Sequence, residues 1–235
     1  MLRMMFREPP RIPEGQLAEA INQMWSFAEL MQRHIQSDGD PEHKLRKYEI
    51  WTRGLIGSID EMEQSCYAAN RFAEKLTGVA VHEMAEEEQL DYHRYVFFDK
   101  NGFIRMFALL DKLGTLLNNV LGLETERMKA QFSYFTVLRN MRLNRKHPAL
   151  GTALDEIKER YKEPMNRLRK RRNVEIHYMN SELQDDLLQS YNQSGEKHKL
   201  ENISMQTEDL RLGLELVLEA LQLSYRYCCE QWGCE

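Results

Sequence analysis

The stretch FIRMFALLDKLGTLLNNVLGL, residues 103–123, is strongly apolar, and its apolar residues recur at helical spacing. This spacing is typical of a helix buried in a core. The preceding residues, from 85 onward, have the same helical character but contain DKNG at 99–102. DKNG fits either a turn or an irregularity that a helix tolerates, and we expect the helix to continue through it. The sequence therefore predicts a helical region across residues 85–123.

Helical spacing extends to both sides of this region. A first helix is expected at residues 17–35, and it ends at SDGDPE (37–42), where glycine and proline favour a turn. A long second helix is expected from residue 42 to residue 76. The last helix covers residues 207–232, where leucines recur along one side. These long amphipathic segments predict a core made by packing helices together.

The remaining segments are shorter and more polar. Residues 132–150 are predicted to form a looser basic segment that stops at Pro148. Two helical stretches follow at 149–163 and 164–178, and Pro164 can start the second of them as a first-turn residue. Residues 180–206 are polar and form the best candidate loop. Because no repeat and no convincing strand occurs, we predict an irregular tail at residues 1–13 and a single all-α helical-bundle domain at residues 14–235.

Composition limits the classes of function. The chain has 235 residues, 42% of them hydrophobic, and a net charge of −5, which argues against a surface that coats nucleic acid or anionic membrane throughout. No run approaches the length of a membrane span, and the N-terminus lacks the apolar core of a signal peptide. The four cysteines and their spacing favour ordinary thiols over a metal site. We expect a reduced, cytoplasmic protein without a metal or cofactor.

Positive charge is concentrated in one part of the chain. Residues 139–177 contain twelve Lys or Arg and five Asp or Glu, a local balance of +7, so the remainder of the chain sums to −12. Such a segment can present one basic groove that binds a short stretch of polyanion. The alternative is a solvated helix face, which is the usual explanation for a run of charges. The arginine bias favours phosphate binding, because a guanidinium can contact two phosphate oxygens at once.

The densest part of this segment is RLRKRRNVEIHYMN, residues 167–180. Asn173 and His177 are four residues apart, so a helix places them on one face. Arg172 and His177 are separated by about 140° around a straight helix and need a long side chain or a loosened helix end to meet. A histidine that moves protons and an arginine that stabilises phosphoryl charge could cleave RNA without metal. The candidate phosphate-binding residues are Arg167, Arg169, Lys170 and Arg171.

The sequence LRKRRNVEIHY resembles the Arg–(Asn/His/Asp)–x–x–x–His motif of the HEPN superfamily of helical-bundle proteins, on Arg172, Asn173 and His177. A second resemblance lies in FALLDKLGTLLNN, which is similar to an Asp–Lys–(Ile/Leu)–(Gly/Ala) helix of several HEPN subfamilies. It places that motif on Asp111 and Lys112, followed by leucine and glycine. The resemblance covers mainly residues 100–232, and the long N-terminal helices would make this an elaborated member.

The resemblance implies a metal-independent endoribonuclease in which attack by the 2′-hydroxyl leaves a 2′,3′-cyclic phosphate. It implies His177 as the proton-transfer residue, Arg172 as the phosphate clamp and Asn173 as polar support, with Asp111 as a buried partner. It further implies a homodimer that acts as a toxin or defence component, with an antitoxin protein as a partner. Asp111 and Lys112 can equally have a purely structural role.

Two other hypotheses remain open. In one, the chain is a non-catalytic HEPN-like module that binds a nucleotide or a protein partner with the same basic groove. In the other, the chain is a plain helical interaction protein and the motif is a coincidence. A His177 side chain that is buried, or that points away from the basic residues, would favour coincidence.

Overall fold

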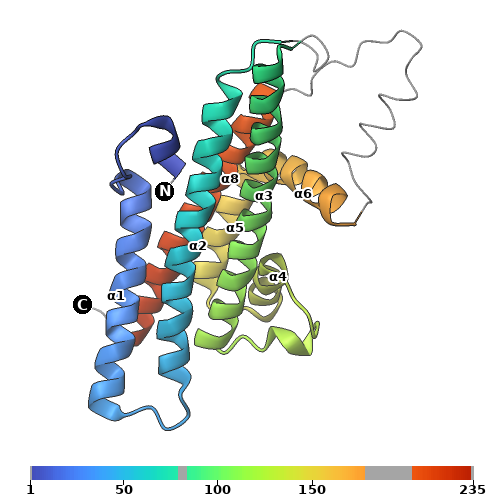
Figure 1. Ribbon diagram of the computed structural model, residues 1–235. Helices are drawn as coiled ribbons and strands as arrows, with labels where there is room; N and C mark the ends of the chain where they lie inside the picture. Colours follow the sequence, from blue (N-terminus) through green and yellow to red (C-terminus); the bar gives the residue numbers. More distant parts are fainter. Residues whose placement is uncertain (1, 79–83, 178–202, 234–235) are drawn as a thin grey trace. The chain divides into compact units, whose positions relative to one another are not determined.

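The computed structural model describes residues 2–78, 84–177 and 203–233, and these residues are helical with no strand among them (Figure 1). The predicted all-α fold class, with long N-terminal helices, is therefore confirmed. The α-helices are α1 (Gly15–Asp38), α2 (Lys44–Ala73), α3 (Glu86–Val120), α4 (Tyr134–Asn144), α5 (Pro148–Arg160), α6 (Lys162–His177) and α8 (Ile203–Trp232). Two short 3₁₀ helices, η1 (Leu2–Phe6) and η3 (Thr125–Arg127), complete the described elements.

The chain divides into two compact units. Unit 1 contains Met1–Pro9, Met62–Ile104 and Lys162–Leu214, and unit 2 contains Pro10–Glu61, Arg105–Tyr161 and Glu215–Glu235. Unit 1 therefore holds α6 with parts of α2, α3 and α8. Unit 2 holds α1, α4 and α5 with the remaining parts of the same three long helices. The expectation of one domain from residue 14 onward stays a prediction.

The core of unit 2 is built on apolar helix faces. α1 and the first part of α2 form a helical hairpin joined by a short turn (Figure 1). Phe27 of α1 packs edge-on against Tyr225 of α8 at 5.5 Å between ring centroids. The Tyr225 hydroxyl donates a hydrogen bond to the Thr52 hydroxyl of α2 at 3.2 Å. Burying this phenol without a polar partner would be costly, so the hydrogen bond fixes how the three helices meet.

The predicted loose segment at 132–150 is wrong, because residues 134–144 form α4. Ser133 and Thr136 make a capping box at its N-terminus, which supplies partners for two backbone N–H groups that the helix leaves unpaired. Val137, Leu138 and Met141 are buried on its inner face. Pro148 does not stop a helix but begins α5 at the first-turn position, where its fixed φ suits a helix and its missing N–H costs nothing.

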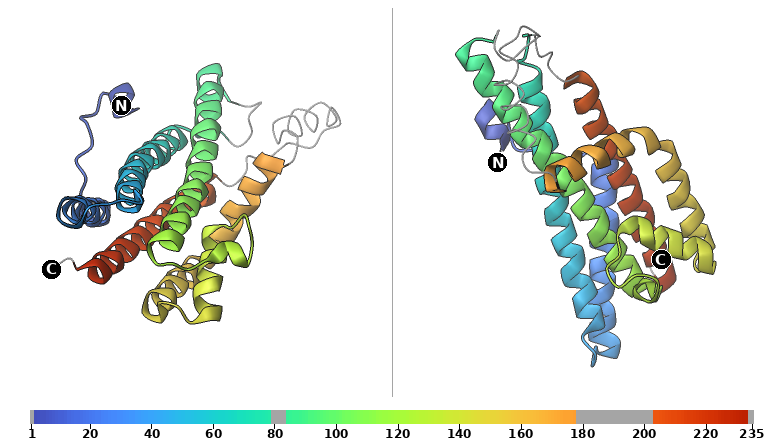
Figure 2. Two further views of the ribbon diagram at one scale, coloured as in Figure 1. Left: turned by 90° about the horizontal axis from the view of Figure 1, so that it is seen from below. Right: turned by 90° about the vertical axis from the view of Figure 1, so that its right-hand side faces the viewer.

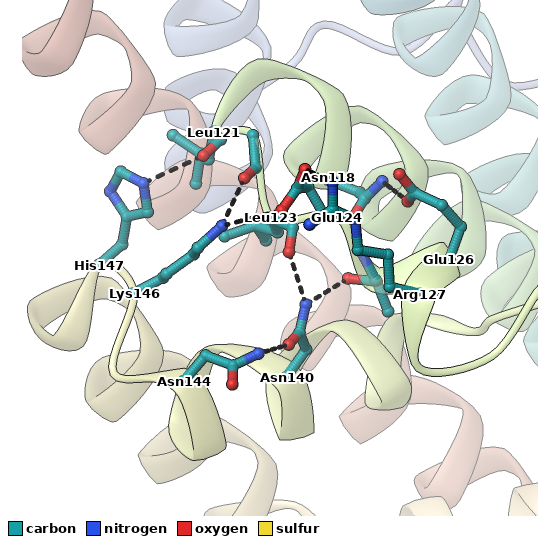
Figure 3. A network of polar contacts seen from close by, with 12 residues as sticks. Asn118, Leu121, Leu123, Glu124, Glu126, Arg127, Asn140, Asn144, Lys146 and His147 are labelled. Carbon is teal, nitrogen blue, oxygen red and sulfur yellow. Dashed lines mark hydrogen bonds and ion pairs between the residues drawn. The ribbon is translucent and has the colours of Figure 1, made fainter.

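A buried polar network ties α4 to the segment that follows α3 (Figure 3). The side-chain amide of Asn140 donates to the Leu123 carbonyl and to the Thr125 hydroxyl, both at 2.9 Å. The side-chain oxygen of Asn118 accepts a hydrogen bond from the Thr125 backbone N–H at 2.8 Å. Because these buried groups satisfy one another, the network specifies how α4 sits within unit 2.

In unit 1, α3 is continuous through DKNG, as predicted, and α6 lies across it (Figure 2). Gly102 allows α3 and α8 to pack closely, because an added Cβ there would lie 3.1 Å from the Leu210 Cδ1 of α8. The buried Tyr95 hydroxyl donates to the Gln206 side chain at 2.7 Å. α8 already begins at Ile203, four residues before the predicted start, so the end of the predicted loop is helical. Residues 180–202 of that loop lie outside the described residues.

Candidate functional site

α6 carries the candidate motif on a helix that is anchored to unit 1 along one side. Pro164, Met165 and Leu168 are buried, and they hold the first half of the helix. Residues 171 and 175 follow Leu168 at helical spacing, so the same side continues toward the C-terminal end. This anchored side separates the cations of α6 into two groups with different environments.

Arg167 and Arg171 point to the anchored side, where each meets a buried carboxylate. Arg167 donates to both carboxylate oxygens of Asp209 of α8, from Nε at 2.8 Å and from Nη2 at 2.6 Å. The hydrogen bond to Asp209 raises the pKa of the Arg167 guanidinium. Arg171 forms an ion pair with Asp99 of α3, and its guanidinium lies 5.0 Å from the Phe103 ring centroid. The two carboxylates are almost fully buried, so both arginines act as anchors for α6.

These ion pairs weaken the prediction that Arg167 and Arg171 bind phosphate. A carboxylate already neutralises each of them, so less of their charge is left for a polyanion. Lys100 of α3 adds a second link between α3 and α6, because its ammonium pairs with Glu175 at 3.1 Å. The other cations close to the motif on α6 are Arg169, Lys170 and Arg172.

Asn173 and His177 lie on the outward side of α6, whereas Arg172, one turn after buried Leu168, lies at the border with the anchored side and has a buried Nε. Lys170 and His177 are exposed, and Arg169, Arg172 and Asn173 are partly exposed. Burial lowers the pKa of the Arg169 guanidinium, and the positive charge of Arg172 lowers it further. Crowded guanidinium groups of this kind repel each other, and a bound anion would relieve the repulsion. Phosphate binding by Arg169 and Lys170 stays a prediction.

His177 is the last residue of α6 and is exposed, as is the preceding Ile176 at 52%. The His177 side chain is therefore neither buried nor covered by the described residues. Asn173 lies one turn before it on the same side of the helix. Arg172 lies about 140° around the helix axis from His177, with Ile176 and Asn173 in the sector between them. The outward side thus presents the amide and the imidazole together, and the long Arg172 side chain would have to reach round the helix to meet the same ligand.

Asp111 and Lys112 belong to unit 2 and have contacts there. The Asp111 carboxylate accepts a hydrogen bond from the Tyr134 backbone N–H at 2.9 Å, at the first residue of α4. Lys112 donates to the Ser58 hydroxyl of α2 at 2.9 Å. Leu113 is fully buried, and a Cβ on Gly114 would lie 2.8 Å from the Tyr134 Cα. All four residues of DKLG therefore contribute to packing, and Asp111 caps α4 in the way an N-cap residue does.

Two residues that matter to α6 were missed by sequence reasoning, namely Asp99 and Asp209. Both are acidic residues within apolar helices, and both are buried with their guanidinium partners. A buried acid needs such a partner, so an isolated Asp in an apolar helix face is the signal that could have found them. The sequence did not reveal which arginine each would meet, because that depends on how the helices cross.

Other sequence features have ordinary structural roles. His147, which follows Arg142 at the same spacing as His177 follows Arg172, makes a hydrogen bond with the Tyr227 hydroxyl at 2.9 Å and precedes α5. Cys66, Cys228 and Cys229 are buried thiols, and burial raises the pKa of Cys66. Cys234 lies outside the described residues. Within residues 2–78, 84–177 and 203–233, no cluster of His, Cys, Asp and Glu has the arrangement of a metal site.

The described part of the chain contains several long helices, and a membrane span must be both long and apolar. None of them combines the length and the apolar character needed to cross a bilayer.

The chain matches a known protein family over most of its length. A family model described as "HEPN_Cthe2314:-like HEPN" matches residues 51–229. The matched region includes most of α2, all of α3 to α6 and most of α8, and so contains both DKLG and the motif on α6. No curated protein and no solved structure matches the chain.

Proposed function

Because the chain belongs to the Cthe2314-like HEPN family, we propose that it is a metal-independent endoribonuclease whose active site is the outward side of α6. The observation that supports the proposal most is the exposure of His177 at the end of α6, beside Arg172 and Asn173. The third hypothesis, coincidence, required a buried His177 or one turned away from the basic residues. His177 is exposed, and it follows Arg172 and Asn173 on the same helix. Both observations favour a functional site over a coincidental motif.

The proposed reaction is transfer of the phosphodiester to the 2′-oxygen of the same nucleotide. The 2′-oxygen bonds to phosphorus, the bond to the 5′-oxygen of the next nucleotide breaks, and a 2′,3′-cyclic phosphate remains. His177 accepts the 2′-hydroxyl proton, and a proton is returned to the leaving 5′-oxygen. Arg172 stabilises the negative charge that develops on the phosphoryl oxygens, and Asn173 orients the imidazole or a phosphate oxygen.

A homodimer completes this proposal. One histidine cannot remove one proton and donate another in the same step, so His177 of the partner subunit would supply the second proton. Exposed Ile176 beside the motif supports such an arrangement, since it would be covered when two α6 helix ends face each other across RNA. Arg169 and Lys170 contact the RNA backbone outside the cleaved bond. We further propose a cytoplasmic toxin or defence role, with an antitoxin protein as a partner.

The proposal is tested by incubating the full-length protein with single-stranded and structured RNA in the presence of EDTA. The matched variants are His177→Ala, Arg172→Ala and, as a control, His93→Ala, which removes another exposed histidine of unit 1. We expect wild type and His93→Ala to cleave RNA and to leave cyclic phosphate ends. Cleavage should fall by about 100-fold or more in each motif variant.

Other results would indicate a different function. RNA or nucleotide binding without cleavage by a folded dimer would overturn the nuclease and favour the non-catalytic binding module. Cleavage that persists in both motif variants would assign the activity to other residues or to a contaminant. Size-exclusion chromatography with light scattering on the same samples determines whether the active species is a dimer.

A further inference from the structure

The exposed side of α4 in unit 2 combines positive charge with uncovered apolar side chains. Its residues are Met128 and Lys129 before the helix and Phe135, Arg139 and Leu143 along it, and we call them the basic–apolar face. Phe135, Arg139 and Leu143 are successive i, i+4 neighbours, so they form one line along the helix surface. This line is separate from the motif on α6 and has no role in the proposed cleavage.

The apolar part of this face is unusually open. Leu143 is 57% exposed and Met128 is 43% exposed, although the opposite side of α4 is packed. Met128, Lys129, Phe135, Thr136 and Arg139 line a shallow hollow of about 480 Å³, which has room for apolar side chains of another molecule. Apolar side chains that border a hollow are more informative than isolated exposed ones, because a partner can bury them together.

The charged part of the face is not neutralised within the part of the chain that the structure describes. There, no carboxylate forms an ion pair with the side chains of Lys129, Arg139 or Arg145. Arg142 only approaches Asp155 at 4.0 Å, with 62% of its side chain exposed. Arg142 and Arg145 lie outside the face and line a second hollow with Asp155, Glu156 and Glu159, which Lys129 and Arg139 do not line. A negatively charged partner would therefore meet cations that are still available.

We propose that the basic–apolar face docks an acidic amphipathic helix of another protein. Apolar residues of that helix, spaced i, i+4, would enter the hollow and cover Leu143, and its carboxylates would pair with Lys129 and Arg139. α4 has 11 residues, so a partner helix of about three turns matches its length.

A protein helix fits this face better than RNA does. A phosphate backbone would satisfy Lys129 and Arg139 but would leave Met128 and Leu143 against charged oxygens, with no apolar burial. Surfaces for single-stranded RNA use exposed aromatic rings for stacking. Phe135 is only partly exposed, and its ring already packs edge-on against Tyr134 at 5.3 Å between centroids.

The test measures binding of a fluorescent synthetic peptide to the full-length protein by anisotropy. The peptide is a helix about three turns long, with leucines at i, i+4 and i+7 and glutamates on both flanks of the leucine stripe. Two further probes are a scrambled peptide of the same composition and a short polyuridine RNA. The variants are Arg139→Glu and Leu143→Ser, and the control is Arg226→Glu, which reverses an exposed arginine of α8 in the same unit.

We expect wild type to bind the amphipathic peptide and to bind the scrambled one more weakly. Arg139→Glu should weaken peptide binding by about tenfold or more, because it places two like charges face to face. Leu143→Ser should weaken binding several-fold, and Arg226→Glu should have no more than about a twofold effect. Circular dichroism checks that each variant is folded.

Three results would overturn the proposal. One is failure of wild type to bind the amphipathic peptide, or equal binding of the scrambled peptide. The second is peptide binding that neither Arg139→Glu nor Leu143→Ser changes. The third is preferential binding of polyuridine that Arg139→Glu weakens and Leu143→Ser does not, which would make the face a nucleic-acid surface.

Discussion

Residues 111–114 of α3 and residues 172–177 of α6 both resemble HEPN motifs, yet their environments are opposite. In the first segment, Asp111 caps α4, Lys112 reaches Ser58 and Gly114 permits close approach of Tyr134. In the second, guanidinium groups are crowded and the histidine is exposed. The contrast separates two kinds of motif. The first motif contributes to the fold through these contacts, and the second, with its exposed histidine at the helix end, is the one that we propose to act on a ligand.

The anchored side of α6 gives the largest predicted effect on stability. Asp99→Ala would leave the guanidinium of Arg171, which is only 23% exposed, without its carboxylate. Because breaking a buried pair from one side leaves a charge uncompensated, we expect a loss of about 3 kcal/mol in the free energy of unfolding. Chemical denaturation measures this loss.

A solvent-exposed pair in the same unit serves as the control for Asp99→Ala. Glu208 and Arg211 form an i, i+3 pair with side chains about half exposed. Glu208→Ala should cost less than about 1 kcal/mol. Equal, small losses in both variants would mean that Asp99 does not anchor α6.

Disturbing the close approach of α4 to α3 should give the second-largest loss of stability. Gly114→Ala would place a Cβ 2.8 Å from the Tyr134 Cα, so backbone must move. We expect a loss of about 2 kcal/mol in unfolding free energy, as for overpacked cores. Gly54→Ala is the matched control, because an added Cβ there meets nothing within 4 Å and should stabilise its helix by about 0.5–1 kcal/mol. Changes of the same sign in the two variants would contradict this packing.

The cap on α4 should have a smaller effect. Asp111→Ala removes the acceptor for the Tyr134 N–H, and we expect a loss of about 1 kcal/mol by thermal or chemical unfolding. Asp111→Asn, which keeps an acceptor oxygen, should lose less. RNA cleavage by either folded variant should match wild type. A selective loss of cleavage would instead place Asp111 in the active site, as the buried partner that the resemblance implied.

Removing a cation from the other side of α6 should give the smallest change in the free energy of unfolding. The change should be a gain, whereas the variants above lose stability. Arg169→Gln removes a guanidinium that burial and Arg172 disfavour, so we expect a gain of about 0.5 kcal/mol or less in stability at low salt. The gain should shrink as ionic strength rises, because salt screens the repulsion. Lys170→Gln, an exposed neighbour, is the control and should change stability less. A clear loss of stability in Arg169→Gln would show that Arg169 is an anchor like Arg171.

Much of the fold could be predicted from the sequence. Apolar spacing located the long helices, and the resemblance carried by Arg172, Asn173 and His177 is confirmed at the level of the family. α4 was missed because its basic residues and the nearby Pro148 made the segment look irregular. The apolar face of α4 was hidden among these residues, and the caps of the helix are local hydrogen bonds. The anchors Asp99 and Asp209 were missed because partner choice depends on helix crossing, which residue spacing does not encode.

The site itself remains a prediction, and neighbouring arginines offer its most direct test. Arg171→Gln and Arg172→Gln remove similar groups from adjacent residues, one that is anchored to Asp99 and one that belongs to the proposed active site. Unfolding and RNA cleavage with EDTA present should be measured on both.

We predict that Arg171→Gln loses about 2 kcal/mol of stability but still cleaves RNA below its unfolding temperature. Arg172→Gln should stay within about 1 kcal/mol of wild type in stability and lose about 100-fold or more in cleavage. If folded Arg171→Gln fails to cleave while Arg172→Gln cleaves normally, the outward side of α6 is not the active site.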